Sequence, residues 1–347
     1  FKNMGTILNA YFSNDVKKRD YIWWDRANSI KEQFRDSVFF DIDNKNITVS
    51  LEELKSFTDL LSRRLDVSIR KAKDKKSKLY YSYFIYEVKK YKRNKNGHII
   101  PLVFKRKSLP LFLEAPVHIL RTHRINHFPD YMRKSPLYDK KLKMYKLNES
   151  LKDTPLEIGR SRVFPRGWLE NESIWLHMEY KYLLELINSG LYDDFYKDFS
   201  NCAVCFLDPL SYGRSILENS SFIVSSAYPD KSLSSRGFVA RLSGATVELL
   251  NIWIIICLGR RPFFTDKEGR LCIKLSPVIK KDLFTTKPVS FELAGKDIKL
   301  PADTFSFKLF SSILVVYHNP KRRDSFKAKV RRIEIETGNK KTAINSD

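Results

Sequence analysis

Two adjacent tryptophans beside a carboxylate form the first group of residues that could do chemistry, Trp23-Trp24-Asp25. An indole face can stack on the apolar face of a sugar ring, and apolar walls raise the pKa of a carboxyl toward the range of a general acid. The same segment also fits the start of a helix with two core tryptophans and a surface pair of Asp25 with Arg26. Both interpretations stay open on these residues alone.

A second group combines a carboxylate, an amide and a histidine, namely Glu170, Asn171 and His177. The apolar pattern predicts a helix over residues 168–187, which Gly190 is placed to end. Glu170 and His177 would share one face of this helix, because seven residues are close to two turns. We interpret the group either as a polar ligand site or as a core histidine with satisfied hydrogen bonds.

A third group is Ser243-Gly244, which opens a predicted helix over residues 243–258. The first N–H groups of a helix have no partner within it and favour anions, and a glycine lets an anion approach the backbone closely. Ordinary helix capping is the alternative interpretation. The irregular segment 208–242 precedes this helix, and a loop of that length inside a compact domain is more often functional than not.

Two weaker groups resemble metal ligands. Cys202 and Cys205 have a zinc-like spacing, but no second pair of Cys or His follows them. Three histidines cluster without an acidic shell, namely His118, His123 and His127. We therefore expect no metal.

The elements that position these groups follow from hydrophobic period and turn signals. The length of 347 residues suggests two domains. Asn96-Gly97 is a strong turn signal between two β-prone runs. Short β-type runs after residue 270 suggest a small sandwich. We predict a mainly α domain over 1–265 with a basic hairpin inserted at about 79–105, a β-sandwich over 266–336, and a frayed tail over 337–347.

The net charge of +23 is unevenly distributed along the chain. Residues 70–107 contain 14 Lys or Arg and 2 acids, whereas residues 150–260 contain 11 basic and 13 acidic residues. We interpret the basic stretch as a solvated hairpin with inward-packed aromatics, not as a nucleic-acid site. The longest apolar candidate, Val247 to Leu258, falls short of the roughly 18 to 20 residues that span a bilayer.

The three groups together resemble the C-terminal part of the inverting phosphorylases of glycoside hydrolase family 94, the cellobiose-phosphorylase type with its larger β-glucan phosphorylase relatives. The family's Trp-x-Asp motif is matched by Trp23-Trp24-Asp25. Its Glu-Asn, followed by five residues and a histidine, is matched by Glu170-Asn171 and His177. Its Thr-Gly at a helix start corresponds to Ser243-Gly244, which follows His177 by 66 positions. The family's Gly-Gly after Glu-Asn is replaced here by Glu172-Ser173.

The resemblance covers roughly residues 20–285 and implies an (α/α)₆ toroid followed by a small β-sandwich. It implies cleavage of a β-linked glucoside or gluco-oligosaccharide by phosphate, which gives α-glucose 1-phosphate without a cofactor or a metal. The roles that it implies are general acid for Asp25, phosphate binding for His177, Ser243 and Gly244, and sugar binding for Trp23, Glu170 and Asn171.

Further expectations follow from this interpretation. We expect the chain to be part of a longer cytoplasmic enzyme, with an oligosaccharide and phosphate as its ligands and with neither nucleic acid nor membrane as partner; a homodimer stays open. One alternative is an inverting hydrolase on the same toroid, with Glu170 or Glu218 as the second carboxylate. The other is an inactive fragment that binds carbohydrate or nucleic acid.

Overall fold

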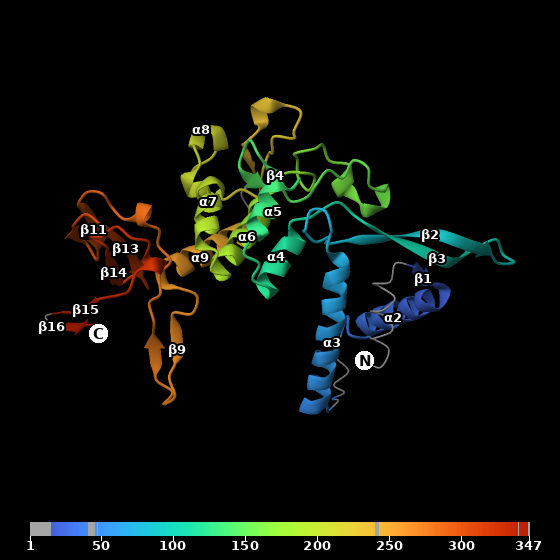
Figure 1. The fold of residues 1–347 in the computed structure, drawn as a ribbon, viewed down its shortest axis with the longest axis horizontal. Coiled ribbons are helices and arrows are strands. Elements are labelled where there is room, and N and C mark those ends of the chain that lie inside the picture. Colours follow the sequence, from blue (N-terminus) through green and yellow to red (C-terminus); the bar gives the residue numbers. More distant parts are fainter. Residues whose placement is uncertain (1–14, 41–45, 47, 240–242, 339, 346–347) are drawn as a thin grey trace. The chain divides into compact units, whose positions relative to one another are not determined.

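The computed structural model describes residues 15–40, 46, 48–239, 243–338 and 340–345, and it divides the chain into two units. The first unit comprises Phe1–Trp175 and Val224–Ser235, and the second comprises Leu176–Ile223 and Arg236–Asp347. Figure 1 shows the order of their elements along the chain. Each unit is described by itself below.

The first unit begins with two helices and a three-stranded sheet. Helices α2 (Lys18–Ser37) and α3 (Leu51–Ala72) are followed by the hairpin of β2 (Phe84–Arg93) and β3 (Ile99–Ser108), and β1 (Asp15–Lys17) pairs with the other edge of β3. A capping box starts α3, because Ser50 and Glu53 bond each other's backbone N–H. Gly97 takes a φ of +80° in the hairpin turn, which glycine adopts without strain.

The rest of the first unit is mostly irregular chain around a small core. It contains α4 (Glu114–Thr122), α5 (Phe128–Lys134), the paired β4 (Tyr138–Asp139) and β5 (Met144–Tyr145), β6 (Ile174–Trp175) and the 3₁₀ turns η1 (Leu156–Ile158), η2 (Arg160–Arg162) and η4 (Lys231–Leu233). Its fully buried large side chains include Leu113, Phe128, Met132, Leu137 and Tyr145. Burial of such side chains is the main stabilising term for this part of the chain.

The second unit is built on a helical layer. Helix α6 (Leu176–Asn188) packs on both α7 (Tyr192–Cys202) and α9 (Ser243–Leu258). Along the chain, four short elements separate α7 from α9: η3 (Val204–Phe206), α8 (Pro209–Tyr212) and the antiparallel pair β7 (Phe222–Ile223) and β8 (Gly237–Phe238). The buried face between the helices includes Tyr180, Leu183, Phe195, Phe199 and Ile252. This layer fixes where α6 and α9 begin.

The C-terminal part of the second unit is a series of hairpins. Four antiparallel pairs follow one another: β9 (Phe263–Thr265) with β10 (Leu271–Ile273), β11 (Val289–Leu293) with β12 (Lys296–Leu300), β13 (Thr304–Leu309) with β14 (Ile313–His318), and β15 (Arg332–Thr337) with β16 (Lys340–Asn345). The turns η5 (Lys281–Leu283) and η6 (Ser325–Lys327) lie between them. Each strand pairs only with its neighbour in sequence among the described residues.

The predicted fold class, a mainly α toroid followed by a β-sandwich, is wrong. The described part of the chain has eight α-helices, with 36% helix and 25% strand in many small antiparallel sheets, and it suggests no (α/α)₆ toroid. The fold is therefore mixed. Two physical reasons account for the difference: buried polar side chains replace helical hydrogen bonds over residues 135–175, and the C-terminal strands pair locally instead of merging into larger sheets.

One smaller difference concerns the C-terminal end of the prediction. Residues 340–345, expected in a frayed tail, form β16 against β15. Among the described helices, none combines the length and the apolar composition that a membrane crossing requires.

Candidate functional site

The segment before α6 is a strained turn instead of the predicted first half of a helix. Leu169 and Glu172 take left-handed backbone conformations, with φ of +45° and +59°. The N–H of Asn171 donates to Trp168 O at 3.1 Å, and that of Gly167 donates to Asn171 O at 2.7 Å. The expectation that Glu170 and His177 share a helix face is wrong, because α6 begins only at Leu176.

Glu170 and Asn171 differ in what their side chains can still bind. Asn171 is 2% exposed; its Nδ2 donates to Phe164 O at 2.8 Å and its Oδ1 accepts from Leu151 N at 3.4 Å. One carboxylate oxygen of Glu170 accepts from Arg160 at 3.2 Å, while the other is buried without a hydrogen-bond partner among the described residues. Glu170 therefore keeps a free acceptor, and Asn171 holds the turn together.

Glu172, named above only as a departure from the family pattern, makes two ion pairs in this turn. It is 3% exposed and pairs with Lys146 at 2.8 Å and with the guanidinium of Arg166. Burial alone raises the pKa of this carboxyl, but hydrogen bonds from Arg166 and Lys146 and their charges outweigh burial and hold the pKa below its usual range. The turn is thus fastened by a buried ion pair.

In the second unit, the starts of α6 and α9 meet at His177 and Gly244. A Cβ added at Gly244 would lie 2.9 Å from both Cε1 and Nδ1 of His177 and 3.0 Å from its Cγ. The imidazole therefore packs directly against the backbone of the first turn of α9. Helix N-termini carry partial positive charge and N–H groups without a partner inside the helix, although at α6 the N–H of Leu176 donates to Ser221 O at 3.3 Å. That arrangement suits an anion.

The charges around His177 set its protonation. Burial lowers the pKa of its imidazole, the nearby charge of Lys181 lowers it further, and Glu248 opposes both; the net direction is downward. The distance from His177 Nε2 to Glu248 Oε1 is 3.7 Å. At pH 7 the ring is neutral and donates one hydrogen bond.

Asn219 links the two helices beside this point. Its Oδ1 accepts from the hydroxyl of Tyr180 in α6 at 3.1 Å, and its Nδ2 donates to Thr246 Oγ1 in the first turn of α9 at 3.3 Å. The sequence analysis placed Asn219 in the irregular segment 208–242 without a role. Its contacts are with side chains far away in sequence, which no local signal predicts.

The remaining predicted site residues are placed as follows. Asp25 is exposed on α2, and the side chain of Trp23 on the same helix lies outside what the structure describes. Ser243 is the first residue of α9, and its side chain is likewise not described. Asp25, Glu170 and Asn171 belong to the first unit, whereas His177, Ser243 and Gly244 belong to the second. Of the predicted pairs, the structure brings His177 and Gly244 together.

We expect Gly244→Ala to lower the free energy of unfolding by about 1 to 2 kcal/mol, toward the lower end of the cost of overpacking. The added Cβ overlaps the imidazole of His177, and this ring is 34% exposed and can move only in part. Urea unfolding measures the effect. The double variant Gly244→Ala with His177→Ala is the control, because it removes the overlapping ring and should recover most of the loss. A single variant as stable as the parent chain would contradict this contact.

Among the described residues, no group of three or more His, Cys, Asp or Glu side chains is arranged to hold a metal ion. No protein-family model matches the chain, and no curated protein matches it either.

Proposed function

We propose that this protein is an inverting glycoside phosphorylase that cleaves a β-linked glucoside with inorganic phosphate. The observation that supports the proposal is the contact of His177 with Gly244 at two adjoining helix starts. The motif match assigned phosphate to both residues. Gly244 follows His177 by 67 positions in the sequence. A separation of that size does not by itself bring two residues into contact.

A second observation agrees with the motif match. The family pattern has glycine where this chain has Glu172, and Glu172 takes a φ of +59°, a conformation that glycine adopts without strain. The turn after Glu-Asn therefore has the backbone shape that the glycine of the pattern favours. The carboxylate at this position is instead used in the ion pairs with Lys146 and Arg166.

The proposed reaction is a single displacement. A phosphate oxygen attacks the anomeric carbon from the face opposite the leaving group, the glycosidic bond breaks, and the proton of Asp25 goes to the leaving oxygen. The product is α-glucose 1-phosphate and a shortened sugar. Phosphate takes the place of the water and of the second carboxylate that an inverting hydrolase uses.

The roles of the side chains follow from their chemistry. Neutral His177 donates one hydrogen bond to phosphate, and the N–H groups of Ser243 and Gly244 donate others. Trp23 and Glu170 are assigned to the sugar by the motif, and one buried carboxylate oxygen of Glu170 has no hydrogen-bond partner among the described residues. Asn171 is assigned a positioning role, because both ends of its amide bond the backbone. Asp25 is assigned from its motif alone.

The test of the proposal is phosphate dependence. The complete protein is incubated with β-linked gluco-oligosaccharides, and glucose 1-phosphate and free sugar are quantified with and without phosphate. We expect glucose 1-phosphate only when phosphate is present. Release of free sugar that is independent of phosphate would replace the proposal by a hydrolase.

His177→Ala is expected to raise the KM for phosphate by roughly 10- to 150-fold, the effect of losing one hydrogen bond to a charged group. The KM for the oligosaccharide should change little, because His177 is assigned to phosphate alone. Initial rates at varied concentrations of each substrate measure both constants. His98→Ala, which removes an exposed histidine in the hairpin turn, is the matched control. Equal increases of both constants in His177→Ala would assign the effect to folding instead.

A further inference from the structure

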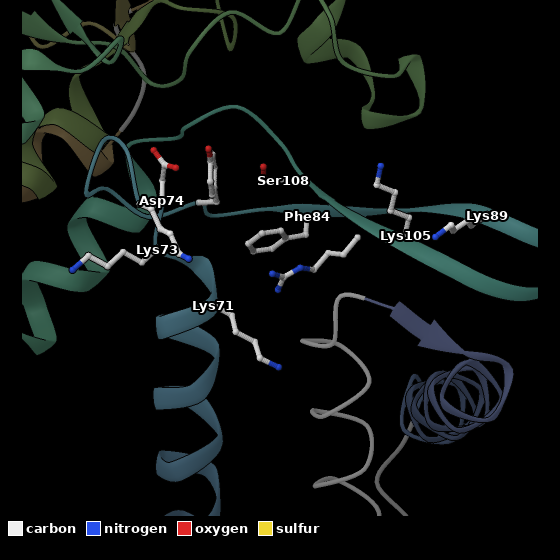
Figure 2. A pocket seen from close by; sticks show the side chains of 10 residues that line it. Lys71, Lys73, Asp74, Phe84, Lys89, Lys105 and Ser108 are labelled. Carbon is white, nitrogen blue, oxygen red and sulfur yellow. The ribbon is translucent and has the colours of Figure 1, made fainter.

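A pocket of about 560 Å³ lies in the first unit, between the end of α3 and the hairpin of β2 and β3. Figure 2 shows side chains from these elements around the hollow, among them Lys71, Lys73 and Lys105. We propose that this pocket binds a small ligand that carries two or more phosphate groups. The proposal is independent of the phosphorylase proposal, which places its phosphate at His177 in the second unit.

The charge of the pocket is almost entirely positive. Asp74 is the one acid among the described residues that line it, and it accepts hydrogen bonds from the backbone N–H and the hydroxyl of Ser77, at 2.8 and 2.6 Å. Like charges that line one pocket repel one another, and an anion with several charges relieves the repulsion at several of them at once. The cations that line the pocket are Lys71, Lys73, Lys75, Lys89, Lys105 and Arg106.

Arg106 offers a specific point of contact. Its guanidinium lies over the ring of Phe84, 4.5 Å from the ring centroid, and its Nη1 is buried without a hydrogen-bond partner among the described residues. A buried donor that lacks a partner is costly, and an anion oxygen that accepts from it removes the cost. Arginine is well suited to phosphate, because its N–H groups match the spacing of two phosphate oxygens.

The backbone holds the lining residues in place. The N–H of Asp74 donates to Leu79 O at 2.8 Å, and that of Tyr81 donates to Ala72 O at 3.0 Å, so the end of α3 is tied to the start of the hairpin. On β2 the ladder to β3 shifts register between Val88 and Lys90, which leaves Lys89 at a bulge. A bulge re-aims the side chain at its position, and Lys89 is one of the lining residues.

The pocket suits a small phosphate ligand better than a nucleic-acid strand. Single strands are bound by stacking bases on free aromatic faces. The aromatic rings of this pocket are already engaged, because Arg106 covers Phe84 and Tyr81 meets Phe84 edge-on at 6.3 Å. A hollow of this volume is in the ordinary range for small-molecule sites. The sequence predicted a solvated hairpin, but it did not predict that cations of this hairpin line a pocket.

Binding of inorganic phosphate, pyrophosphate and tripolyphosphate to the complete protein, measured by calorimetry, tests the proposal. We expect affinity to rise with the number of phosphates. The variant Lys105→Gln with Arg106→Gln should weaken tripolyphosphate binding by roughly 10- to 100-fold, and Lys89→Gln with Lys105→Gln, which changes only exposed side chains, should weaken it at least several-fold. Thermal unfolding checks that each variant is folded.

The matched control is Lys92→Gln with Lys95→Gln, which removes two exposed lysines of the same hairpin outside the pocket. Its affinity for tripolyphosphate should stay close to that of the parent. The proposal is overturned if tripolyphosphate does not bind, or if the control weakens binding as much as the pocket variants, which would mean diffuse attraction to the hairpin. Tighter binding of an RNA oligonucleotide than of tripolyphosphate, lost equally in all variants, would replace it by a nucleic-acid surface.

Discussion

Glu172→Gln is expected to lower the free energy of unfolding by about 3 to 5 kcal/mol, the scale for removing one partner from a buried ion pair. Glutamine keeps the size of the side chain and its backbone preference, so the change isolates the charge. Lys146, only 12% exposed, would keep its ammonium without the carboxylate that now compensates it at 2.8 Å, and Arg166 would lose the same partner. Urea unfolding at neutral pH measures the loss.

The control is Glu157→Gln, which makes the same chemical change at an exposed glutamate of the same unit. It should change the free energy of unfolding by less than about 0.5 kcal/mol, as surface substitutions usually do. A loss for Glu172→Gln no larger than that of Glu157→Gln would mean that the ion pairs contribute nothing to stability.

The stability difference between the parent chain and Glu172→Gln should depend on pH. The folded pKa of Glu172 lies below the ordinary value of 4.5, so the folded chain binds fewer protons at this site than the unfolded chain does in acid. The stability from its ion pairs is therefore fully present above about pH 4.5 and is lost as the pH falls through the folded pKa. The difference between the parent and Glu172→Gln should be full at pH 7 and shrink progressively below pH 4.5.

Local signals in the sequence predicted single elements well. Helix α9 spans Ser243–Leu258, the predicted range, and the turn of the hairpin contains Asn96-Gly97. Val289–Leu293, one of the short β-type runs after residue 270, forms a strand. Caps, turns and β-branched runs act within a few residues, so they can be interpreted without knowledge of the fold.

Features that depend on distant residues were not predicted. Strands β12 and β16 were missed for a different, local reason: each contains two lysines and has a weak β-type pattern, although each pairs with the strand directly before it. Residues 168–175 have an apolar pattern that fits a helix, but the amide of Asn148 bonds Glu170 O at 2.6 Å and Glu172 N at 2.7 Å and bends the chain instead. A buried amide that takes over backbone hydrogen bonds leaves no periodic trace in the sequence.

Some features of the candidate site could be predicted from the sequence, and others could not. The resemblance assigned His177 and Gly244 to one phosphate site, and the structure places the two residues in contact, whereas their binding of phosphate stays a prediction. Glu248 and Asn219, which flank that contact, carry no signal of their own. The basic stretch was correctly located by counting charges, but only the structure shows that its cations from α3, β2 and β3 surround one pocket.

Asp25→Asn is expected to reduce turnover of an oligosaccharide by roughly 10²- to 10⁴-fold, the usual contribution of a general acid. Asparagine has nearly the same shape and cannot supply a proton to the leaving oxygen. Asp36→Asn, at another exposed aspartate of α2, is the matched control and should keep the turnover of the parent. Initial rates of glucose 1-phosphate formation in the complete protein measure both variants.

An activated aryl β-glucoside separates proton donation from any other role of Asp25. Its leaving group departs as a stable anion and needs no proton, so the loss seen with the oligosaccharide should largely disappear when this substrate is used with phosphate. A folding defect or a lost sugar contact would lower turnover of both substrates alike, because neither depends on the leaving group. Near-normal turnover of the oligosaccharide by Asp25→Asn would instead assign the proton to another residue, and Glu170, with its unpartnered buried oxygen, would be the next carboxylate to replace.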